Sequence, residues 1–341
     1  MAAKPTQLVG QASAFLDAIE RASAAAALSR PVLVVGERGT GKEMVAERLH
    51  RLSPRWEEPL VALNCAALPE TLIDAELFGY EAGAFTGAMK ARGGKFEEAD
   101  GGTLFLDEVG TLTPAGQERL LRVIEYGELT RLGSNRVLNV DVRVVAATNE
   151  DLPRLAAQGR FRADLLDRLS FEVITLPPLR ARLEDVPLLA DFFGRRMASE
   201  IGWTAFPGFS KGAIELLLAH DWPGNVRELR NVVERSVYRW GEPDRPVGAI
   251  EIDPFESPWR PGGAFAGPCG AAPARSSEES EPADFRTAVA AYEKRLLARA
   301  MERARHNQRK AAAALGLSYD QLRHALKRHG MLGTEGASEA A

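Results

Sequence analysis

The segment that most limits how this chain can fold runs from Val32 to Glu43 and reads VLVVGERGTGKE. Its four apolar residues, three of them β-branched, predict a buried parallel strand, and the glycines that follow predict a loop whose backbone N–H groups surround a phosphate. A helix is expected to begin near Gly41, with its positive dipole end facing the same anion and Lys42 reaching the β- and γ-phosphates. The G-x-x-x-x-G-K spacing favours this nucleotide loop over a plain glycine turn.

One residue of this segment departs from the usual nucleotide-loop pattern. The predicted nucleotide contacts are Gly36, Glu37, Arg38, Gly39, Thr40, Gly41, Lys42 and Glu43. At the last of these positions the usual pattern has Ser or Thr, so the hydroxyl that binds magnesium in other loops of this kind is absent.

The composition is that of a globular chain with two to three domains. Hydrophobic residues make up 45% and charged residues 26% of the 341 residues, and no apolar run approaches the 18 or so residues that span a bilayer. The N-terminus lacks the apolar core of a signal peptide, so a cytoplasmic location is expected. Cys65 and Cys269 have no paired spacing, which supports neither a disulfide framework nor a zinc site.

The charge is distributed unevenly along the chain. Residues 284–330 contain eleven Lys or Arg against four Asp or Glu, a net charge of +7. Because the whole chain carries −4, the remaining residues carry −11. A basic tail on an acidic body suggests a nucleic-acid partner for the tail, and the alternative is a solvated charged helix.

Polar side chains follow three further segments that are predicted to be strands. They are Asn64 after residues 60–63, Asp107 and Glu108 after residues 101–106, and Thr148 and Asn149 after residues 142–147. At the carboxyl edge of a parallel sheet, Asp107 suits magnesium or its water shell, and Glu108 suits the orientation of an attacking water, although two acids there could instead cap the next helix. Asn64 could orient a catalytic neighbour or be a turn residue, and Thr148 and Asn149 could sense the γ-phosphate.

Two other segments carry candidate contacts with other protein molecules. Residues 79–88 have neither a helical nor a strand period, and their glycines flank an aromatic residue, which predicts a loop that presents Phe85 and Thr86 to a partner. Arg162 and Arg168 either pair with Asp164 and Asp167 or enter the site of a neighbouring subunit as arginine fingers.

The region after residue 175 is predicted to be helical, with a break. The sequence WPGNVREL at 222–229 predicts a turn and a helix start that has Arg227 in its first turn. A cation is poorly placed there for its own helix dipole, so a bound phosphate is a plausible reason for it. Earlier in the chain, Trp56 lies among charges and prolines, either at a core edge or as an exposed anchor for a partner.

The C-terminal part predicts a linker followed by a helix-turn-helix. Residues 241–283 are rich in Pro, Gly and Ser, and two short helices are expected around Gly316 after a longer one at 285–304. The second short helix starts at Ser318, a good N-cap, and places the basic charge where DNA would bind. Its predicted DNA contacts are Ser318, Tyr319, Gln321, Arg323, His324 and Lys327.

Taken in order, these motifs resemble the bacterial enhancer-binding activators of sigma-54 RNA polymerase over nearly the whole chain. The hexapeptide GAFTGA at 83–88 is specific to that clade, which also shares the Glu after Lys42. The resemblance implies an α/β AAA+ P-loop ATPase with a parallel sheet and a C-terminal helical lid, and an all-α Fis-type helix-turn-helix domain. The implied boundaries are 1–175 for the α/β subdomain, 176–245 for the lid, 246–283 for the linker and 284–332 for the DNA-binding domain.

The resemblance also implies a role for each matching residue. Lys42 would contact phosphates, Asp107 would serve magnesium, and Glu108 would polarise water. Asn64 is similar to the amide that switches Glu108 between states. The remaining assignments are Thr148 and Asn149 to the first sensor, Arg162 and Arg168 to the fingers, Arg227 to the second sensor, and Gly83, Ala84, Phe85, Thr86, Gly87 and Ala88 to the contact with sigma-54.

The implied mechanism is ATP hydrolysis with Mg in a ring, expected to be a hexamer, that moves the Phe85 loops against sigma-54 and converts a closed promoter complex into an open one. Since no receiver or sensor domain precedes the nucleotide loop, the chain is most similar to the phage-shock branch of the family, for which phage shock protein A is the implied inhibitory partner. Two alternatives remain: a DNA-bound regulator that does not remodel polymerase, and a generic AAA+ unfoldase or repair motor. The intact hexapeptide argues against the first and the helix-turn-helix against the second.

Overall fold

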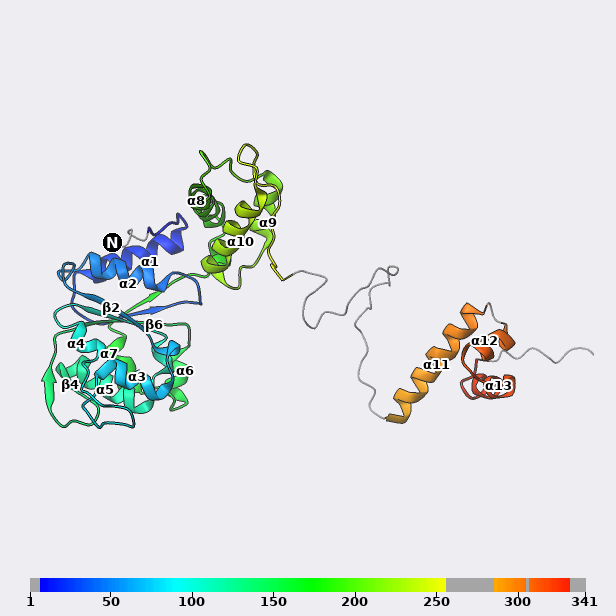
Figure 1. Ribbon diagram of the computed structural model, residues 1–341, viewed down its shortest axis with the longest axis horizontal. Helices are drawn as coiled ribbons and strands as arrows, with labels where there is room; N and C mark the ends of the chain where they lie inside the picture. Colours follow the sequence, from blue (N-terminus) through cyan, green and yellow to red (C-terminus); the bar gives the residue numbers. More distant parts are fainter. Residues whose placement is uncertain (1–6, 256–284, 305–306, 332–341) are drawn as a thin grey trace, which may run out of the picture. The chain divides into compact units, whose positions relative to one another are not determined.

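The computed structural model describes residues 7–255, 285–304 and 307–331 of the chain (Figure 1). They belong to two compact units, residues 1–257 and 258–341, which are treated separately below. No helix among these described residues is long and apolar enough to cross a membrane.

The first unit is built on a five-stranded sheet in which every neighbouring pair is parallel, in the order β2-β3-β6-β1-β7. The strands are β1 (Val32–Val35), β2 (Leu60–Asn64), β3 (Thr103–Asp107), β6 (Arg143–Thr148) and β7 (Glu172–Thr175). In register, Val35 pairs with Thr148 and Thr175, and Asn64 pairs with Asp107. The carboxyl ends of the strands therefore lie along one edge, where ligands bind in open α/β sheets.

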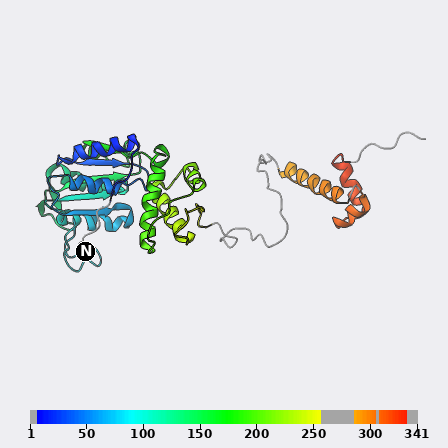
Figure 2. The same cartoon turned by 90° about the horizontal axis from the view of Figure 1, so that it is seen from above.

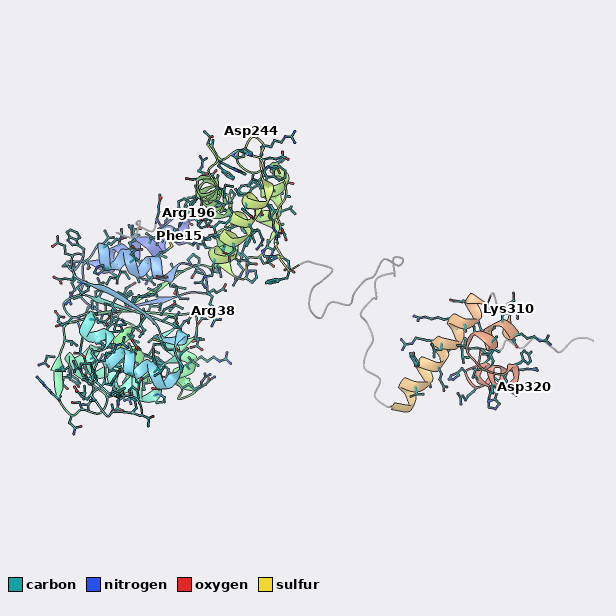
Figure 3. All side chains as sticks on the ribbon, in the orientation of Figure 1. Phe15, Arg38, Arg196, Asp244, Lys310 and Asp320 are labelled. Carbon is teal, nitrogen blue, oxygen red and sulfur yellow. The ribbon has the colours of Figure 1, made fainter. Side chains whose placement is uncertain are left out.

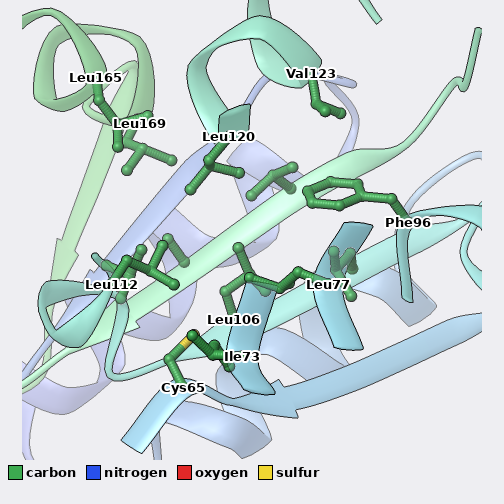
Figure 4. Packing of buried hydrophobic residues seen from close by; sticks show 14 of the residues in the cluster. Cys65, Ile73, Leu77, Phe96, Leu106, Leu112, Leu120, Val123, Leu165 and Leu169 are labelled. Carbon is green, nitrogen blue, oxygen red and sulfur yellow. The ribbon is translucent and has the colours of Figure 1, made fainter. Parts of the chain in front are cut away.

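Helices cover both faces of this sheet, because its strands alternate apolar side chains between two cores (Figures 1 and 2). Val32 and Val34 pack with α1 (Ser13–Ala26) and α2 (Lys42–Arg51) on one face. Leu33 joins the larger core on the other face, where Leu77, Leu106 and Leu120 also lie (Figure 4). The helices of this second layer are α3 (Glu70–Phe78), α4 (Lys95–Glu98), α5 (Pro114–Tyr126), α6 (Leu152–Ala157) and α7 (Ala163–Leu169).

A small antiparallel hairpin of β4 (Glu128–Thr130) and β5 (Val137–Asn139) projects after α5. The structure pairs Tyr80 with both Arg92 and Leu132, which ties the loop after α3 to this hairpin.

The lid follows β7 and consists of α8 (Asp185–Glu200), α9 (Lys211–Ala219) and α10 (Asn225–Trp240) around a separate apolar core that includes Trp222. Its packed part extends past residue 245, where the sequence placed the start of the linker. Val247 is fully buried, and Arg235 donates hydrogen bonds to the carbonyl oxygens of Glu251 and Ile252 at 2.8 and 3.0 Å. Most of the expected linker, residues 256–283, lies outside the described residues.

Residues 285–304 and 307–331 of the second unit contain three helices: α11 (Phe285–Arg303), α12 (Gln308–Ala314) and α13 (Tyr319–Arg328). Ala311 and Ala312 are buried against Leu322 and Leu326, so small side chains let α12 approach α13 closely. Gly316 adopts a left-handed conformation (φ 65°) in the turn between them, and Ser318 caps α13 in a capping box with Gln321. The α/β, lid and helix-turn-helix parts of the predicted fold class are confirmed.

Candidate functional site

The nucleotide loop joins the carboxyl end of β1 to α2, as the sequence predicts. Its first amide, Gly36 N–H, donates to the carbonyl oxygen of Thr148 at 3.1 Å, which fixes the loop against β6. Gly39 (φ 78°) and Gly41 (φ 103°) take left-handed conformations that a side chain would strain, and Gly41 is the residue before α2. Thr40 is buried and donates its hydroxyl to the carbonyl oxygen of Glu37 at 2.8 Å. Hydrogen bonds on its outer side thus hold the loop in one conformation.

Lys42 is a buried cation at the start of α2. Its Nζ donates to the carbonyl oxygen of Gly36 at 3.0 Å, so the ammonium lies over the loop. Burial lowers the pKa of Lys42, and the nearby carboxylates of Glu108 and Asp107 partly oppose that shift. The first residue of the helix therefore faces the two acids at the end of β3.

Asp107 and Glu108 leave β3 in different directions. Asp107 ends the strand, whereas Glu108 adopts the left-handed conformation (φ 56°) and is only 8% exposed. A non-glycine residue held in this conformation is a common feature of functional sites. Asp107 Oδ1 accepts from the backbone N–H of Glu108 at 3.1 Å, whereas the Glu108 side chain contacts a different group.

That other group is the end of β6. Glu108 Oε2 accepts from the backbone N–H of Asn149 at 3.3 Å, and Arg38 Nε lies 3.9 Å from Glu108 Oε1. With the Asn149 amide turned so that its nitrogen faces the carboxylate, this side chain also donates to Glu108 Oε2 and accepts from Arg38 Nε. Figure 3 labels Arg38 on the side of the α/β subdomain that carries the lid. Thr148 is buried, and its hydroxyl accepts from Glu150 N–H at 3.0 Å, so Asn149 is the more accessible of the two expected sensors.

Asn64 does not contact Glu108 in this structure. Its side-chain Nδ2 donates to Asp107 Oδ2 at 3.2 Å, and its Oδ1 accepts from the backbone N–H of Ala66 at 2.9 Å. The reason is the register of the sheet, which pairs Asn64 with Asp107 while Glu108 turns toward β6. The partner of Glu108 in this conformation is therefore Asn149.

Asp107 fits a magnesium ion that arrives with a nucleotide. Mg²⁺ usually takes one or two carboxylates together with phosphate oxygens and waters. In the part of the chain that the structure describes, no three His, Cys, Asp or Glu side chains gather as a metal cluster. Asp107 beside the phosphate loop would supply the single carboxylate of a magnesium ion that is otherwise bound by phosphate oxygens and waters. Glu43 is exposed in the first turn of α2 and brings no hydroxyl to it.

The lid contacts the outer side of the nucleotide loop through several groups. Two of them, Asn225 and Arg180, were not predicted from the sequence. Asn225 Nδ2 donates to Glu37 Oε2 and to the carbonyl oxygen of Arg38, each at 3.0 Å, and the backbone N–H of Val226 donates to the carbonyl oxygen of Gly39 at 3.0 Å. Arg180 forms two hydrogen bonds with the Glu37 carboxylate, at 2.8 and 2.5 Å. These contacts and the Asn225 hydrogen bond lower the pKa of Glu37 to about 2.

Arg227 lies in the first turn of α10, directly above the loop, and is exposed. A β-carbon built on Gly39 would lie 3.1 Å from the Arg227 Cβ, so the first turn of α10 lies against the nucleotide loop, where the sequence predicts a second sensor. Asn225, which begins the helix, has a left-handed backbone (φ 53°) that asparagine tolerates better than most residues. The position of Asn225 directly after Trp-Pro-Gly is the sequence signal from which a contact between lid and loop could have been predicted.

A buried ion pair strengthens the junction on the side of α1. Arg182 and Asp185 are both fully buried at the start of the lid, with 3.7 Å between Nη1 and Oδ2. Asp185 Oδ1 accepts from the backbone N–H groups of Gln11 and Ala12, while the Arg182 guanidinium lies 4.6 Å from the centroid of the Phe15 ring. The lid, the start of α1 and the nucleotide loop are therefore connected through one set of contacts.

The two finger candidates do not contact the nucleotide loop of their own chain. Arg162 forms an exposed two-point pair with Asp164, at 3.0 and 2.7 Å. Arg168 pairs with Glu125 at 2.7 Å, not with the Asp167 that the sequence offered, because Glu125 is on the neighbouring helix α5. Both guanidinium groups are exposed, as a residue that acts on another subunit would be.

The GAFTGA loop folds back on its own base. Gly83 N–H donates to the carbonyl oxygen of Ala88 at 2.8 Å, and the Phe85 ring meets Tyr80 edge-on with 5.0 Å between centroids. Phe85 is nevertheless 40% exposed, and Thr86 is exposed beside it. In this conformation the loop presents its aromatic residue without burying it in the core.

The candidate DNA contacts all lie on the exposed side of the second unit, and they are Ser318, Tyr319, Gln321, Arg323, His324 and Lys327. The Gln321 side chain is also used locally, since its Oε1 accepts from the backbone N–H of Ser318 at 2.9 Å. Arg323 and Lys327, four residues apart on α13, form a basic pair of the kind that meets phosphates in a DNA groove.

Three known families match consecutive parts of the chain. They are the sigma-54 interaction domain at residues 8–175, an AAA+ ATPase lid domain at 180–243, and the Fis family of bacterial regulatory proteins at 288–329.

Similar proteins cover nearly the whole chain or part of it. The Psp operon transcriptional activator of Escherichia coli K12 is 53% identical over 329 residues, which cover 96% of this chain and 99% of that protein. The regulatory protein ZraR of Salmonella typhimurium is 51% identical over 67% of this chain, and the match spans about half of ZraR, 52%. The crystal structure of NtrX from Brucella abortus in complex with ADP matches with a TM-score of 0.68 and 32% identity, covering 95% of this chain and 70% of NtrX.

These matches agree with the site geometry: a glycine loop with its lysine, two strand-end acids, a lid over the loop and a separate helix-turn-helix. The AAA+ families support ATPase activity in general, and the Fis-family match supports DNA as a partner. The chain belongs to the sigma-54-dependent transcriptional activators, with an AAA+ sigma-54 interaction domain, an AAA+ lid and a Fis-type helix-turn-helix.

Proposed function

We propose that this protein hydrolyses ATP in a ring, a hexamer, and uses the hydrolysis to remodel sigma-54 RNA polymerase from the closed to the open promoter complex. The observation that carries the proposal is the intact GAFTGA loop, with Phe85 and Thr86 exposed, on a chain whose Lys42, Asp107 and Glu108 converge beside one phosphate loop. An ATPase without a polymerase target has no need of such a loop.

The residues divide the chemistry among them. Lys42 and the loop amides bind the phosphates, and Arg227 contacts them from the lid. When bound at Asp107, magnesium neutralises charge on the transferring phosphoryl group. Glu108 orients the attacking water, and its hydrogen bonds to Asn149 place that carboxylate beside the residue proposed to sense the γ-phosphate. Loss of the γ-phosphate would then release Glu108 toward Asn64, which lies on the adjacent strand end.

Ring assembly supplies the remaining group. Arg162 and Arg168 are held by exposed carboxylates in this chain, and exposed pairs of this kind are weak. Either arginine can therefore exchange its partner for the phosphates of a neighbouring subunit at little cost. Such an exchange would make ATPase activity depend on oligomerisation.

The DNA-binding unit would hold the protein at an enhancer and raise its concentration near the polymerase. We propose phage-shock promoters, which respond to envelope stress, as the targets, and the similarity to the Psp operon activator supports them. The proposed location is the cytoplasm. The family resemblance implies phage shock protein A as an inhibitory partner, and we propose it here. Trp56, 61% exposed on the surface of the AAA+ unit, is a suitable anchor for that contact.

The test is promoter opening in a purified system. Sigma-54 holoenzyme, a supercoiled template with an enhancer and ATP are combined with the full chain or with Glu108→Gln. The proposal predicts permanganate-sensitive thymines at the start site with the wild-type chain only. A wild-type chain that hydrolyses ATP and binds the enhancer but opens no promoter would support the alternative of a DNA-bound regulator that does not remodel polymerase.

A second comparison tests the inhibitor. Phage shock protein A is expected to lower the ATPase rate of the wild-type chain and to have much less effect on Trp56→Ala. The exposed Phe171, on the same unit, gives a matched control as Phe171→Ala. Equal inhibition of all three proteins would remove Trp56 from the contact.

A further inference from the structure

The nucleotide loop contains an acidic residue that its expected ligand would repel. Glu37 lies between Gly36 and the phosphate-binding amides, and a triphosphate brings several negative charges to the same loop. Glu37 is among the nucleotide contacts that the sequence predicts. Its carboxylate faces the lid, where Arg180 and Asn225 bind it.

The geometry of this contact satisfies both carboxylate oxygens. Arg180 Nη1 donates to Oε2 at 2.8 Å and Nη2 donates to Oε1 at 2.5 Å, and Asn225 Nδ2 adds a third hydrogen bond to Oε2 at 3.0 Å. A two-point guanidinium pair fixes the direction of the carboxylate as well as its charge. Asn225 is itself fixed, because its Oδ1 accepts from the buried backbone N–H of Leu179 at 2.8 Å.

We propose that Arg180 is a positioning residue for nucleotide binding, which holds the Glu37 carboxylate on the lid side of the loop and neutralises its charge before the phosphates arrive. The inference rests on the proposed ATP site and adds a role for two residues that do not touch the nucleotide. Arg180 lies on the short turn Leu179–Ala181, at the entrance to the lid, so the same contact links nucleotide affinity to the position of the lid.

The orientation of the loop supports this role. In a loop that turns its N–H groups toward a phosphate, the carbonyl groups turn outward, and here lid donors bind three consecutive ones. Asn225 donates to the carbonyl oxygen of Arg38, Val226 N–H to that of Gly39, and Arg182 Nη2 to that of Thr40 at 3.4 Å. Among these contacts between loop and lid, the Glu37–Arg180 pair joins two opposite charges, so loss of Arg180 leaves a carboxylate of the loop without its countercharge.

If Arg180 acts through charge, removal of the Glu37 charge should restore the ATPγS affinity that is lost in Arg180→Gln, whereas a loss of structure would not be restored. Arg180→Gln leaves an unpaired carboxylate in the loop and should weaken binding of ATPγS by about fivefold or more, the lower range of coupling between linked sites. Glu37→Gln combined with Arg180→Gln removes both charges and should return the dissociation constant to within about twofold of the wild-type value. Arg180→Lys keeps the charge without the two-point geometry and should fall between wild type and Arg180→Gln.

The experiment is isothermal titration calorimetry of the full chain with Mg²⁺ and ATPγS, at low salt and at about 1 M salt, where charges are screened within ~3 Å. The defect of Arg180→Gln should shrink at high salt. Arg195→Gln is the matched control, because Arg195 is another exposed lid arginine and pairs with Asp191 at 2.6 Å, away from the loop. It should bind ATPγS as the wild-type chain does.

Each result is decisive. If Arg180→Gln binds as tightly as Arg195→Gln, or if the double variant binds no better than Arg180→Gln, the positioning role is refuted although the ATP site stands. If the wild-type chain itself does not bind ATPγS, the proposed function fails first. Restoration in the double variant, with a salt-dependent defect in the single one, would establish the role.

Discussion

Gly39→Ala should separate the lid from the nucleotide loop, and its cost can be worked out from the contact that the structure shows. An alanine at φ 78° costs about 1–2 kcal/mol in the left-handed region. Its methyl group would lie 2.3 Å from the carbonyl oxygen of Gly224, whereas ordinary contacts begin near ~3.4 Å. Loop and lid backbones would therefore have to move apart by roughly 1 Å.

That movement also breaks a hydrogen bond. The Val226 N–H donates to Gly39 carbonyl oxygen at 3.0 Å, and a shift of this size takes it outside hydrogen-bonding range. The loss costs about 1 kcal/mol, which corresponds to roughly fivefold weaker nucleotide binding if the lid contact preorganises the loop. Gly39→Ala should thus lower both stability and ATPγS affinity.

Gly202→Ala is the matched control for backbone strain. Gly202 has φ 80° and nothing within 4 Å of an added β-carbon, so it shares the strain but not the collision. The midpoint of thermal unfolding should fall by on the order of 5 °C in Gly202→Ala and further in Gly39→Ala, which also loses a hydrogen bond, while calorimetry should show weaker ATPγS binding only in Gly39→Ala. Equal affinity of the two variants would refute the view that lid contact sets the conformation of the loop.

Three further predictions concern catalysis, assembly and DNA binding. Glu108→Ala should keep its fold, seen by circular dichroism, and lose ATP turnover by at least about 100-fold, because positioning supplies most of the catalysis of phosphoryl transfer; near-normal turnover would remove Glu108 from the site. Arg168→Ala should regain part of its ATPase activity when mixed with Glu108→Ala subunits, and no recovery in mixtures that assemble normally would argue against a finger. Deletion of residues 284–341 should abolish enhancer binding in a gel shift while ATPase activity persists, and loss of hydrolysis would contradict the domain boundary.

The sequence predicted the parts of the fold whose signals are local. The strand before the nucleotide loop and the helix after it follow from β-branched residues and glycine spacing. The helix-turn-helix likewise follows from Gly316 and the Ser318 cap. In each case the residues that determine the element lie within it or beside it.

The contacts that the sequence did not predict depend on residues far apart in the chain. Glu37 and Arg180 are 143 positions apart, and only the folded lid brings them together. Glu108 contacts Asn149 instead of Asn64 because its left-handed backbone turns the side chain toward β6. No local sequence pattern predicts this backbone conformation. Val247 looked like linker by composition, yet it fills a space beside α10 that the lid creates.

The central claim, that this ATPase acts on sigma-54, is tested most directly by the loop at Phe85 and Thr86. The measurement is a gel shift of sigma-54 with the protein, ADP and a metal fluoride that mimics the transferring phosphoryl group. The wild-type chain should form the complex, whereas Phe85→Ala and Thr86→Ala should hydrolyse ATP but form none, because both residues lie outside the nucleotide site. Unchanged complex formation by both variants would contradict the account.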